Sequence, residues 1–159
     1  MTLLLWASLL AVTAHLVEEF VFPGGFLAWH RRYRPEHAAS ITPRFAIVVN
    51  GLLLFLLLAI AINGPSSTIG VFQWLTLAAL LITNAAFHIR AVINTRAYSP
   101  GVVTAAFLYV PLGVYGYYWL LRTGAAPVGM AAVALVLGGS YPFVSIVLHR
   151  MRSATHTHA

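Results

Sequence analysis

Five long apolar blocks constrain this 159-residue chain more than any other feature of its sequence. The blocks cover residues 3–22, 44–63, 69–93, 101–121 and 127–149. Each is close to the ~20 residues that an α-helix needs to cross a bilayer. Because a segment in lipid must satisfy its backbone hydrogen bonds internally, such blocks form helices. The sequence therefore predicts an all-α integral membrane bundle of about five transmembrane helices.

The charge content agrees with lipid as the main solvent. Only 8% of the residues are charged, against roughly 25% in a soluble domain. The basic residues are all arginines, and they lie between the apolar blocks rather than in one patch, so we expect no nucleic-acid partner. The chain has no cysteine, which excludes thiolate metal ligands and cysteine nucleophiles.

The arginines also predict how the chain lies in the membrane. Arg122 alone falls on one side of the predicted bundle. The other side holds Arg31, Arg32, Arg34, Arg44, Arg90, Arg96, Arg150 and Arg152. The positive-inside rule then places the N-terminus outside and the C-terminus in the cytoplasm. We expect a multi-pass protein of the cell (plasma) membrane, with one transmembrane domain over residues 1–150 and a flexible tail over 151–159.

Local signals refine the expected helices. Thr42-Pro43 and Ser99-Pro100 each place a capping residue before a proline at the first helical position, and Ser67 stands before the third block. Pro111 and Pro142 lie inside their blocks and predict kinks. The small residues Ala134 and Gly138 permit close helix packing and, as a further expectation, a homodimer.

Three ionisable residues interrupt the first apolar block. His15, Glu18 and Glu19 stand at positions i, i+3 and i+4 and therefore share one face of a helix. Each buried ionisable group costs ~3 kcal/mol or more in the middle of a bilayer, and such groups usually mark function. A divalent cation, a proton on one acid or an arginine partner has to neutralise them.

The third block carries a second polar pair, Asn84 and His88, again at i and i+4. At a rise of about 1.5 Å per residue, this pair occupies the same depth as His15 and Glu19, in the cytoplasmic half of the bilayer. His149 ends the fifth block on the same side. The sequence thus predicts a buried His/Glu/Asn/His cluster that binds a metal.

Two imidazoles and one carboxylate suit Zn²⁺ or Fe²⁺ and leave positions open for water and substrate. The expected metal ligands are His15, Glu19 and His88. We expect Glu18 to act as general base on the bound water, and Asn84 to be a ligand or to orient a substrate oxygen. Additional candidates are His149, Arg96 and Tyr98. The alternative is an ion-pair network in which Arg90 or Arg96 neutralises the two acids and locks the helices together.

The motif His15-Leu-Val-Glu18-Glu19 resembles the HXXEE family, which is named for it. Asn84-Ala-Ala-Phe-His88 and Tyr98-Ser99-Pro100-Gly101-Val-Val-Thr104-Ala are also similar to that family. The resemblance spans the first four blocks. It implies a small multi-pass membrane protein of unassigned function, with functional positions at His15, Glu18, Glu19, Asn84 and His88.

We therefore expect a metal-dependent membrane enzyme whose substrate is amphiphilic, such as a lipid or an isoprenoid. The apolar surroundings and three ligands favour a hydrolase, while iron would favour oxidase chemistry. A metal-free isomerase or cyclase of isoprenoids, which uses one glutamate as acid and one as base, is an alternative. A small metal or proton carrier, or an accessory subunit, is a further one.

Overall fold

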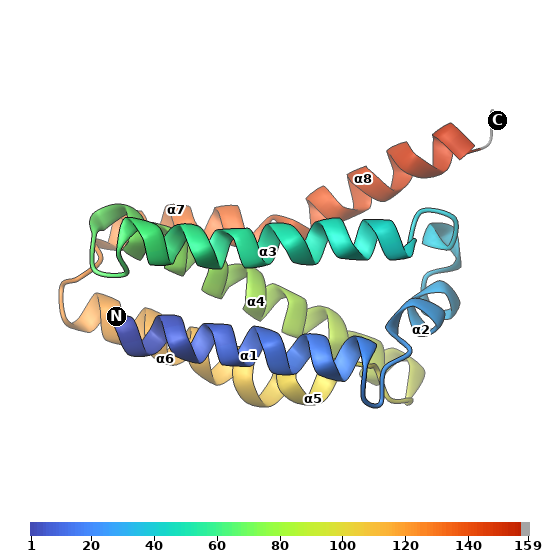
Figure 1. Ribbon diagram of the computed structural model, residues 1–159, viewed down its shortest axis with the longest axis horizontal. Coiled ribbons are helices and arrows are strands. Elements are labelled where there is room, and N and C mark those ends of the chain that lie inside the picture. Colours follow the sequence, from blue (N-terminus) through green and yellow to red (C-terminus); the bar gives the residue numbers. More distant parts are fainter. Residues whose placement is uncertain (157–159) are drawn as a thin grey trace.

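The computed structural model describes the backbone of residues 1–156 and the side chains of residues 1–151. Within that part of the chain all regular structure is helical (Figure 1). The elements are α1 (Thr2–Phe20), α2 (Phe26–Tyr33), η1 (Pro35–His37), α3 (Pro43–Asn63), α4 (Thr68–Thr95), α5 (Val102–Thr104), η2 (Ala105–Tyr109), α6 (Val110–Arg122), α7 (Val128–Gly139) and α8 (Tyr141–His156).

Five helical stretches are long and apolar enough to cross a membrane, which confirms the expected multi-pass helical bundle. They are Thr2–Phe20, Pro43–Asn63, Thr68–Thr95, Val102–Arg122 and Val128–Met151. The fourth stretch combines α5, η2 and α6, and the fifth contains α7 and most of α8. The bounds differ from the expected blocks by a few residues, because apolar composition does not mark where the hydrogen-bonded turns stop.

The helix α4 forms the centre of the bundle. Figure 1 shows it between α3 and α7 on one side and α1 and α6 on the other. Its Trp74, Leu75 and Leu77 are completely buried. Gly116 of α6 lies against Trp74, and Gly138 of α7 lies against the backbone of α4, so no larger residue fits at either position. The small-residue face of α7 therefore packs within the chain.

Two of the three capping signals in the sequence, at Thr42 and Ser67, correspond to real helix starts. The third is wrong, because α5 begins at Val102 without a side-chain cap and the Ser99 hydroxyl contacts His88 instead. The hydroxyl of Thr42 accepts a hydrogen bond from the Phe45 amide at 3.1 Å, at the start of α3. Ser67 does the same for the Gly70 amide at 3.0 Å, at the start of α4. Each side chain satisfies an amide that the first helical turn leaves without a partner.

Both interior prolines coincide with irregular helix. Pro111 follows the π-helical turn η2, as expected where the missing proline N–H frees the carbonyl one turn earlier. Pro142 follows the break at Ser140 between α7 and α8, and Figure 1 shows α8 diverging from the bundle at that point. The helix α8 continues past the expected end at residue 149 to His156. The rest of the expected tail, residues 157–159, lies outside the described part of the chain.

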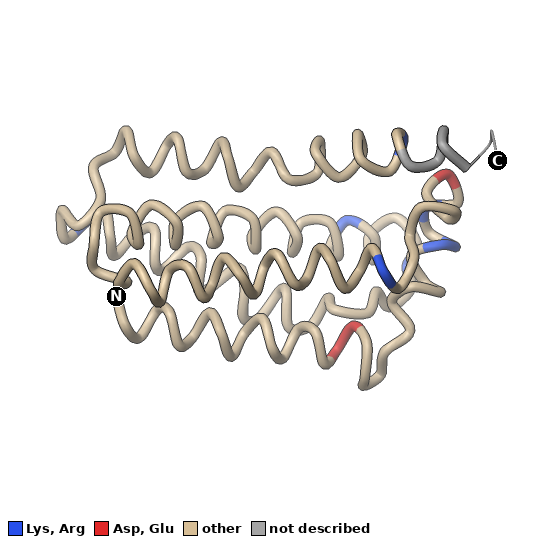
Figure 2. The backbone as a smooth tube through the Cα atoms, turned by 45° about the horizontal axis from the view of Figure 1, so that its top comes forward, with Lys and Arg blue, Asp and Glu red and all other residues tan. Residues whose placement is uncertain are grey.

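The two ends of the bundle differ in charge. Figure 2 shows arginines gathered at the end that carries α2 and the last turns of α8. There α2 and η1 fold over the helix ends in the connection from α1 to α3 (Figure 1). We refer to this as the arginine-rich end. The N-terminus lies at the opposite end (Figure 1).

Candidate metal centre

The helix α1 places three polar side chains in the interior near the arginine-rich end. His15, Glu18 and Glu19 are 3%, 7% and 5% exposed. On the central helix, His88 is fully buried, and its ring centroid lies 5.1 Å from that of His15. The helical spacing noted in the sequence therefore brings groups from two helices into contact.

His15, Glu19 and His88 converge on one point. Oε1 of Glu19 lies 3.3 Å from Nε2 of His15 and 3.2 Å from Nε2 of His88. One potential ligand atom from each residue lies within 4.8 Å of the others. Both Nε2 atoms are buried, and among the described residues each has its close contact with Glu19 without the geometry of a hydrogen bond. These three residues are called the triad below.

Hydrogen bonds on the outer side of His15 define its tautomer. Nδ1 lies 2.9 Å from the hydroxyl oxygen of Thr104. That hydroxyl donates its one proton to an oxygen of Glu18, so it has to accept from Nδ1–H. In a neutral His15, the Nε2 atom that faces Glu19 then carries a lone pair, which is the form that binds a metal.

A second outer contact holds His88. Its Nδ1 lies 2.9 Å from the hydroxyl of Ser99, which is itself buried. An oxygen partner on the far nitrogen is the usual way to fix the ring orientation of a histidine ligand. Both imidazoles of the triad therefore point Nε2 inward because residues 99 and 104 hold Nδ1.

The turn that begins the fourth span closes over the triad at Gly101. Its φ of +99° lies in the left-handed region that favours glycine. A Cβ atom at this position would lie 2.7 Å from Cε1 of His15, 2.9 Å from Cε1 of His88 and 3.0 Å from Cγ of Glu19. Glycine is thus required both by the backbone and by the space that the triad occupies.

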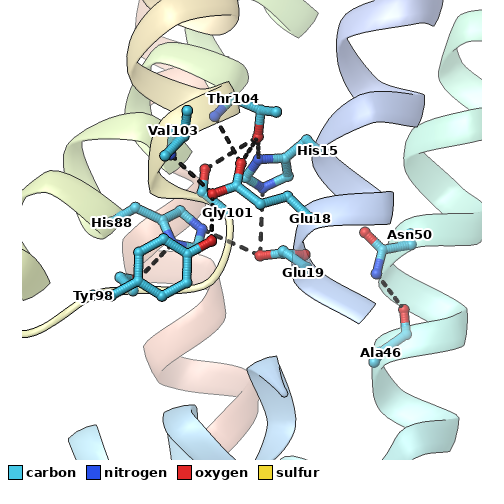
Figure 3. A network of polar contacts seen from close by, with 11 residues as sticks. His15, Glu18, Glu19, Ala46, Asn50, His88, Tyr98, Gly101, Val103 and Thr104 are labelled. Carbon is cyan, nitrogen blue, oxygen red and sulfur yellow. Dashed lines mark hydrogen bonds and ion pairs between the residues drawn. The ribbon is translucent and has the colours of Figure 1, made fainter. Parts of the chain in front are cut away.

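Glu18 turns away from the triad toward this same turn (Figure 3). Its carboxylate accepts hydrogen bonds from the Tyr98 hydroxyl at 2.7 Å, the Val103 amide at 3.0 Å and the Thr104 amide at 2.7 Å. The Thr104 hydroxyl is a fourth donor. Burial, together with the bond to Glu18, raises the pKa of Tyr98 to about 12, so Tyr98 keeps the proton that it donates. These contacts suit an anchor of the turn, and a role as general base stays a prediction.

Asn84 lies beside the triad without joining it. It lines a cavity of about 130 Å³ that also contacts Glu19, and its Oδ1 is buried with no hydrogen-bond partner among residues 1–151. The phenol of Tyr109 resembles it: the ring centroid is 4.6 Å from that of His15, and the buried hydroxyl has no such partner in the described chain. Of these two residues, only Asn84 lines the cavity and can contact a molecule bound there.

His149 belongs to a different group. Its ring stacks on His37 at 4.5 Å and lies 6.0 Å from His30, and its Nδ1 is 2.6 Å from the hydroxyl of Ser40. This histidine cluster lines the cavity with Asn84. His30, His37 and His149 do not bring their ligand atoms close enough together to hold a metal. Among the described residues, only His15, Glu19 and His88 do so.

Within the described part of the chain, the structure does not contain the alternative ion-pair network, in which Arg90 or Arg96 would neutralise Glu18 and Glu19. Glu19 contacts two histidines, and Glu18 accepts from neutral donors. Arg96 is exposed at the C-terminal end of α4, with φ 51°. The acids thus have partners other than Arg90 and Arg96.

Sequence reasoning gave Ser99 only a capping role, considered Tyr109 only as a wall of an isoprenoid pocket, and assigned no role to Gly101 or Thr104. Ser99, Gly101 and Thr104 belong to the motif of residues 98–105 that carries the family resemblance, and their concentration of polar and glycine residues at the start of an apolar span is the signal that could have found them. The placement of Tyr109 next to His15 depends on the π-helical turn, which the sequence does not specify.

Comparison with known proteins gives one match. A family model described as a protein of unknown function with HXXEE motif matches residues 6–116. The matched range contains the triad and the turn that closes it, and it stops before α7 and His149. No significant match was found among the curated proteins or the solved structures.

Proposed function

Because this chain belongs to the HXXEE family, whose function is unknown, we propose from its own side chains that it is a metal-dependent membrane enzyme. The triad His15, Glu19 and His88 holds a divalent ion, Zn²⁺ or Fe²⁺, and the reaction is hydrolysis of an amphiphilic lipid- or isoprenoid-like substrate. One observation carries this proposal, namely that three buried ligand atoms on two helices face one another.

The spacing of these atoms supports a metal. Two ligands at 2.0–2.1 Å from a tetrahedral zinc ion lie about 3.3 Å apart. The two nitrogen–oxygen distances to Glu19 are 3.2 and 3.3 Å. Without a cation, the lone pair on His15 Nε2 would face a carboxylate in a buried place, which is unfavourable. A metal ion removes that repulsion and gives both nitrogens and the carboxylate a shared partner.

When bound, such an ion supplies Lewis acidity and an activated water at neutral pH. The residues around it have separate tasks. Glu18 holds the turn of residues 98–104 in place, and this segment orients both imidazoles. The amide of Asn84 is placed to bind a polar group of the substrate, because it lines the cavity beside Glu19 and its Oδ1 has no partner in the described chain.

We take the arginine-rich end as cytoplasmic, following the positive-inside rule, and the membrane as the plasma membrane. The triad then lies in the cytoplasmic half of the bilayer. The aromatic side chains of Phe20, Phe26 and Phe87 line the cavity beside Glu19, which suits an apolar or amphiphilic molecule better than a water-soluble one.

Hydrolysis of a single-chain ester by the purified protein in nanodiscs tests this proposal. Para-nitrophenyl palmitate releases a coloured product, and the protein would be assayed after chelation and after reloading with Zn²⁺ or Fe²⁺. We expect turnover that chelation abolishes and reloading restores, and that Glu19→Gln lacks in every condition. Turnover that survives chelation would contradict a metal enzyme and favour an acid/base reaction.

The metal-free reading rests on its own observation. His15 with a proton on each nitrogen would also satisfy the contact with Glu19, and that imidazolium–carboxylate pair could donate and remove protons at an alkene. An isoprenoid isomerase or cyclase would need no ion. Metal content separates the two readings, and oxygen consumption by an iron-loaded sample would separate an oxidase from a hydrolase.

A further inference from the structure

A second hollow lies on the outside of the bundle between α1 and α3. This groove has a volume of about 510 Å³. It is lined by Thr13, Leu16, Val17, Phe20, Val21, Leu27, Pro43, Ala46, Ile47, Asn50 and Leu54. Only Thr13 and Asn50 among these are polar. Because it runs along two membrane-spanning helices, the groove faces the acyl chains of the bilayer.

The groove adjoins the cavity beside the triad. Phe20, Ala46 and Asn50 line both hollows. Figure 3 shows Ala46 and Asn50 on α3 across from Glu19 on α1. Only these shared side chains lie between the lipid-facing groove and the cavity that Glu19 lines, and the packed core around α4 does not.

The cavity changes character toward the arginine-rich end. There it is lined by Arg34 and by the histidine cluster of His30, His37 and His149. His30 is 7% exposed, and its Nδ1 is buried with no hydrogen-bond partner among the described residues. Arg34 contacts Glu36 at 3.1 Å in a partly exposed ion pair, which leaves most of its five donors for another anion.

We propose that the two hollows together bind one single-chain amphiphile with an anionic head, either a phosphate or a carboxylate. The chain occupies the groove between α1 and α3, and the head binds Arg34 and His30. This inference rests on the proposed function, because it names the substrate class of that site. The bond that joins head and chain then lies where the hollows meet, beside Glu19.

The charge pattern supports an anionic head over a neutral or cationic one. The guanidinium of Arg34 forms charge-assisted hydrogen bonds with phosphate or carboxylate. A cationic head would be repelled by Arg34, and a neutral alcohol would give the guanidinium no charge-assisted hydrogen bond beyond the one that it already forms with Glu36.

Native mass spectrometry of the protein in neutral detergent tests the inference with matched variants. The probes are hexadecyl phosphate, palmitate, hexadecanol and hexadecyltrimethylammonium, all with the same chain. We expect one molecule of either anion per chain with saturable binding, and at least about tenfold weaker binding of the neutral and cationic probes. A preference between phosphate and palmitate identifies the head.

Two substitutions probe the two ends of the site. Ile47→Trp fills the groove, and Ile62→Trp is its control, because both isoleucines are on α3 and are 71% and 76% exposed. Arg34→Gln removes the charge at the head, and Arg32→Gln removes an exposed charge from the same segment. We expect Ile47→Trp and Arg34→Gln each to bind hexadecyl phosphate about tenfold more weakly than the parent protein. The two control variants should bind it as tightly as the parent.

Equal binding of hexadecyl phosphate and hexadecanol would overturn the inference, as would binding that Ile47→Trp leaves unchanged. The measurement involves no turnover, and it would be repeated after chelation and in Glu19→Gln. Anion binding that persists in both, in a protein that holds no metal, would sustain the inference while the proposed function fails. If the protein holds a metal and hydrolyses its substrate but binds all four probes equally, the proposed function would stand and this inference would fail.

Discussion

The hydroxyl oxygen of Thr104 lies 2.9 Å from Nδ1 of His15 and donates its proton to the carboxylate of Glu18. One side chain thus links a proposed ligand to the acid that anchors the turn. Because Glu18 stands three residues after His15, all of these contacts lie on one face of α1. The arrangement explains why, of two buried adjacent acids, only Glu19 points its carboxylate at the two histidines.

Replacement of Thr104 by valine tests this link. Valine keeps the shape and removes the hydroxyl, so His15 loses its outer partner. Loss of such a contact typically weakens metal binding about 10–100-fold. We expect a weakening of this size in a zinc titration against a competing chelator. Thr104→Ser restores the hydroxyl and should bind zinc like the parent protein, and equal binding by the valine variant would refute the role of Thr104.

Gly101 and Gly25 form a matched pair for testing how the turn meets the triad. Both have positive φ, +99° and +86°, but only Gly101 faces His15, His88 and Glu19, while nothing lies within 4 Å of a Cβ at Gly25. Alanine strains the backbone by ~1 kcal/mol at either site. We expect Gly101→Ala alone to lower zinc affinity and turnover, by at least about tenfold. Equal losses in both variants would point to backbone strain only.

Packing around α4 gives a prediction about stability. A Cβ at Gly138 would clash with the Thr76 carbonyl, whereas a Cβ at the neighbouring Gly139 meets nothing within 4 Å. We expect Gly138→Ala to cost about 1–3 kcal/mol, since overpacking against backbone cannot relax easily. Gly139→Ala should be close to neutral. Thermal unfolding in detergent compares the two, and equal midpoints would contradict the close contact of α4 and α7.

The histidine cluster predicts a pH dependence of stability. Burial, and after it the nearby His149 and His37, lowers the pKa of His30 from 6.5 to about 4. The folded protein therefore takes up this proton less readily than the unfolded chain, and stability present above pH 6.5 is lost as the pH falls toward 4. His30→Phe should flatten this part of the curve. An unchanged slope in the variant would show that His30 does not titrate as expected.

The helical bundle was predictable because apolar length and Thr or Ser caps are local properties. The polar faces of the first and third spans were also predictable, because residues at i and i+4 share one face of a helix however the helices pack. The turn of residues 98–104 was not predictable in the same way. Its Ser99 and Gly101 contact His88 and the triad only after α4 and the fourth span meet in space. The polar and glycine residues at the start of that span mark the turn as unusual, but they do not say which residues it contacts.

The two interior prolines and the segment between α1 and α3 show the same difference between what local sequence predicts and what only the three-dimensional fold reveals. Pro111 and Pro142 predicted irregular helix, but only the fold shows that one produces a π-helical turn beside His15 and the other a break before α8. His149 was grouped with the triad by depth alone. In three dimensions it stacks on His37, because η1 folds back over the arginine-rich end.

Metal content measured by elemental mass spectrometry on the purified protein tests the central claim most directly. Glu19→Gln and His88→Ala would be measured beside the parent, and Glu36→Gln, an exposed acid 3.1 Å from Arg34, serves as control. We expect about one Zn or Fe per chain in the parent and in Glu36→Gln, and none in the two triad variants. A parent protein that holds no metal after reloading, or triad variants that retain it, would contradict a metal site at His15, Glu19 and His88.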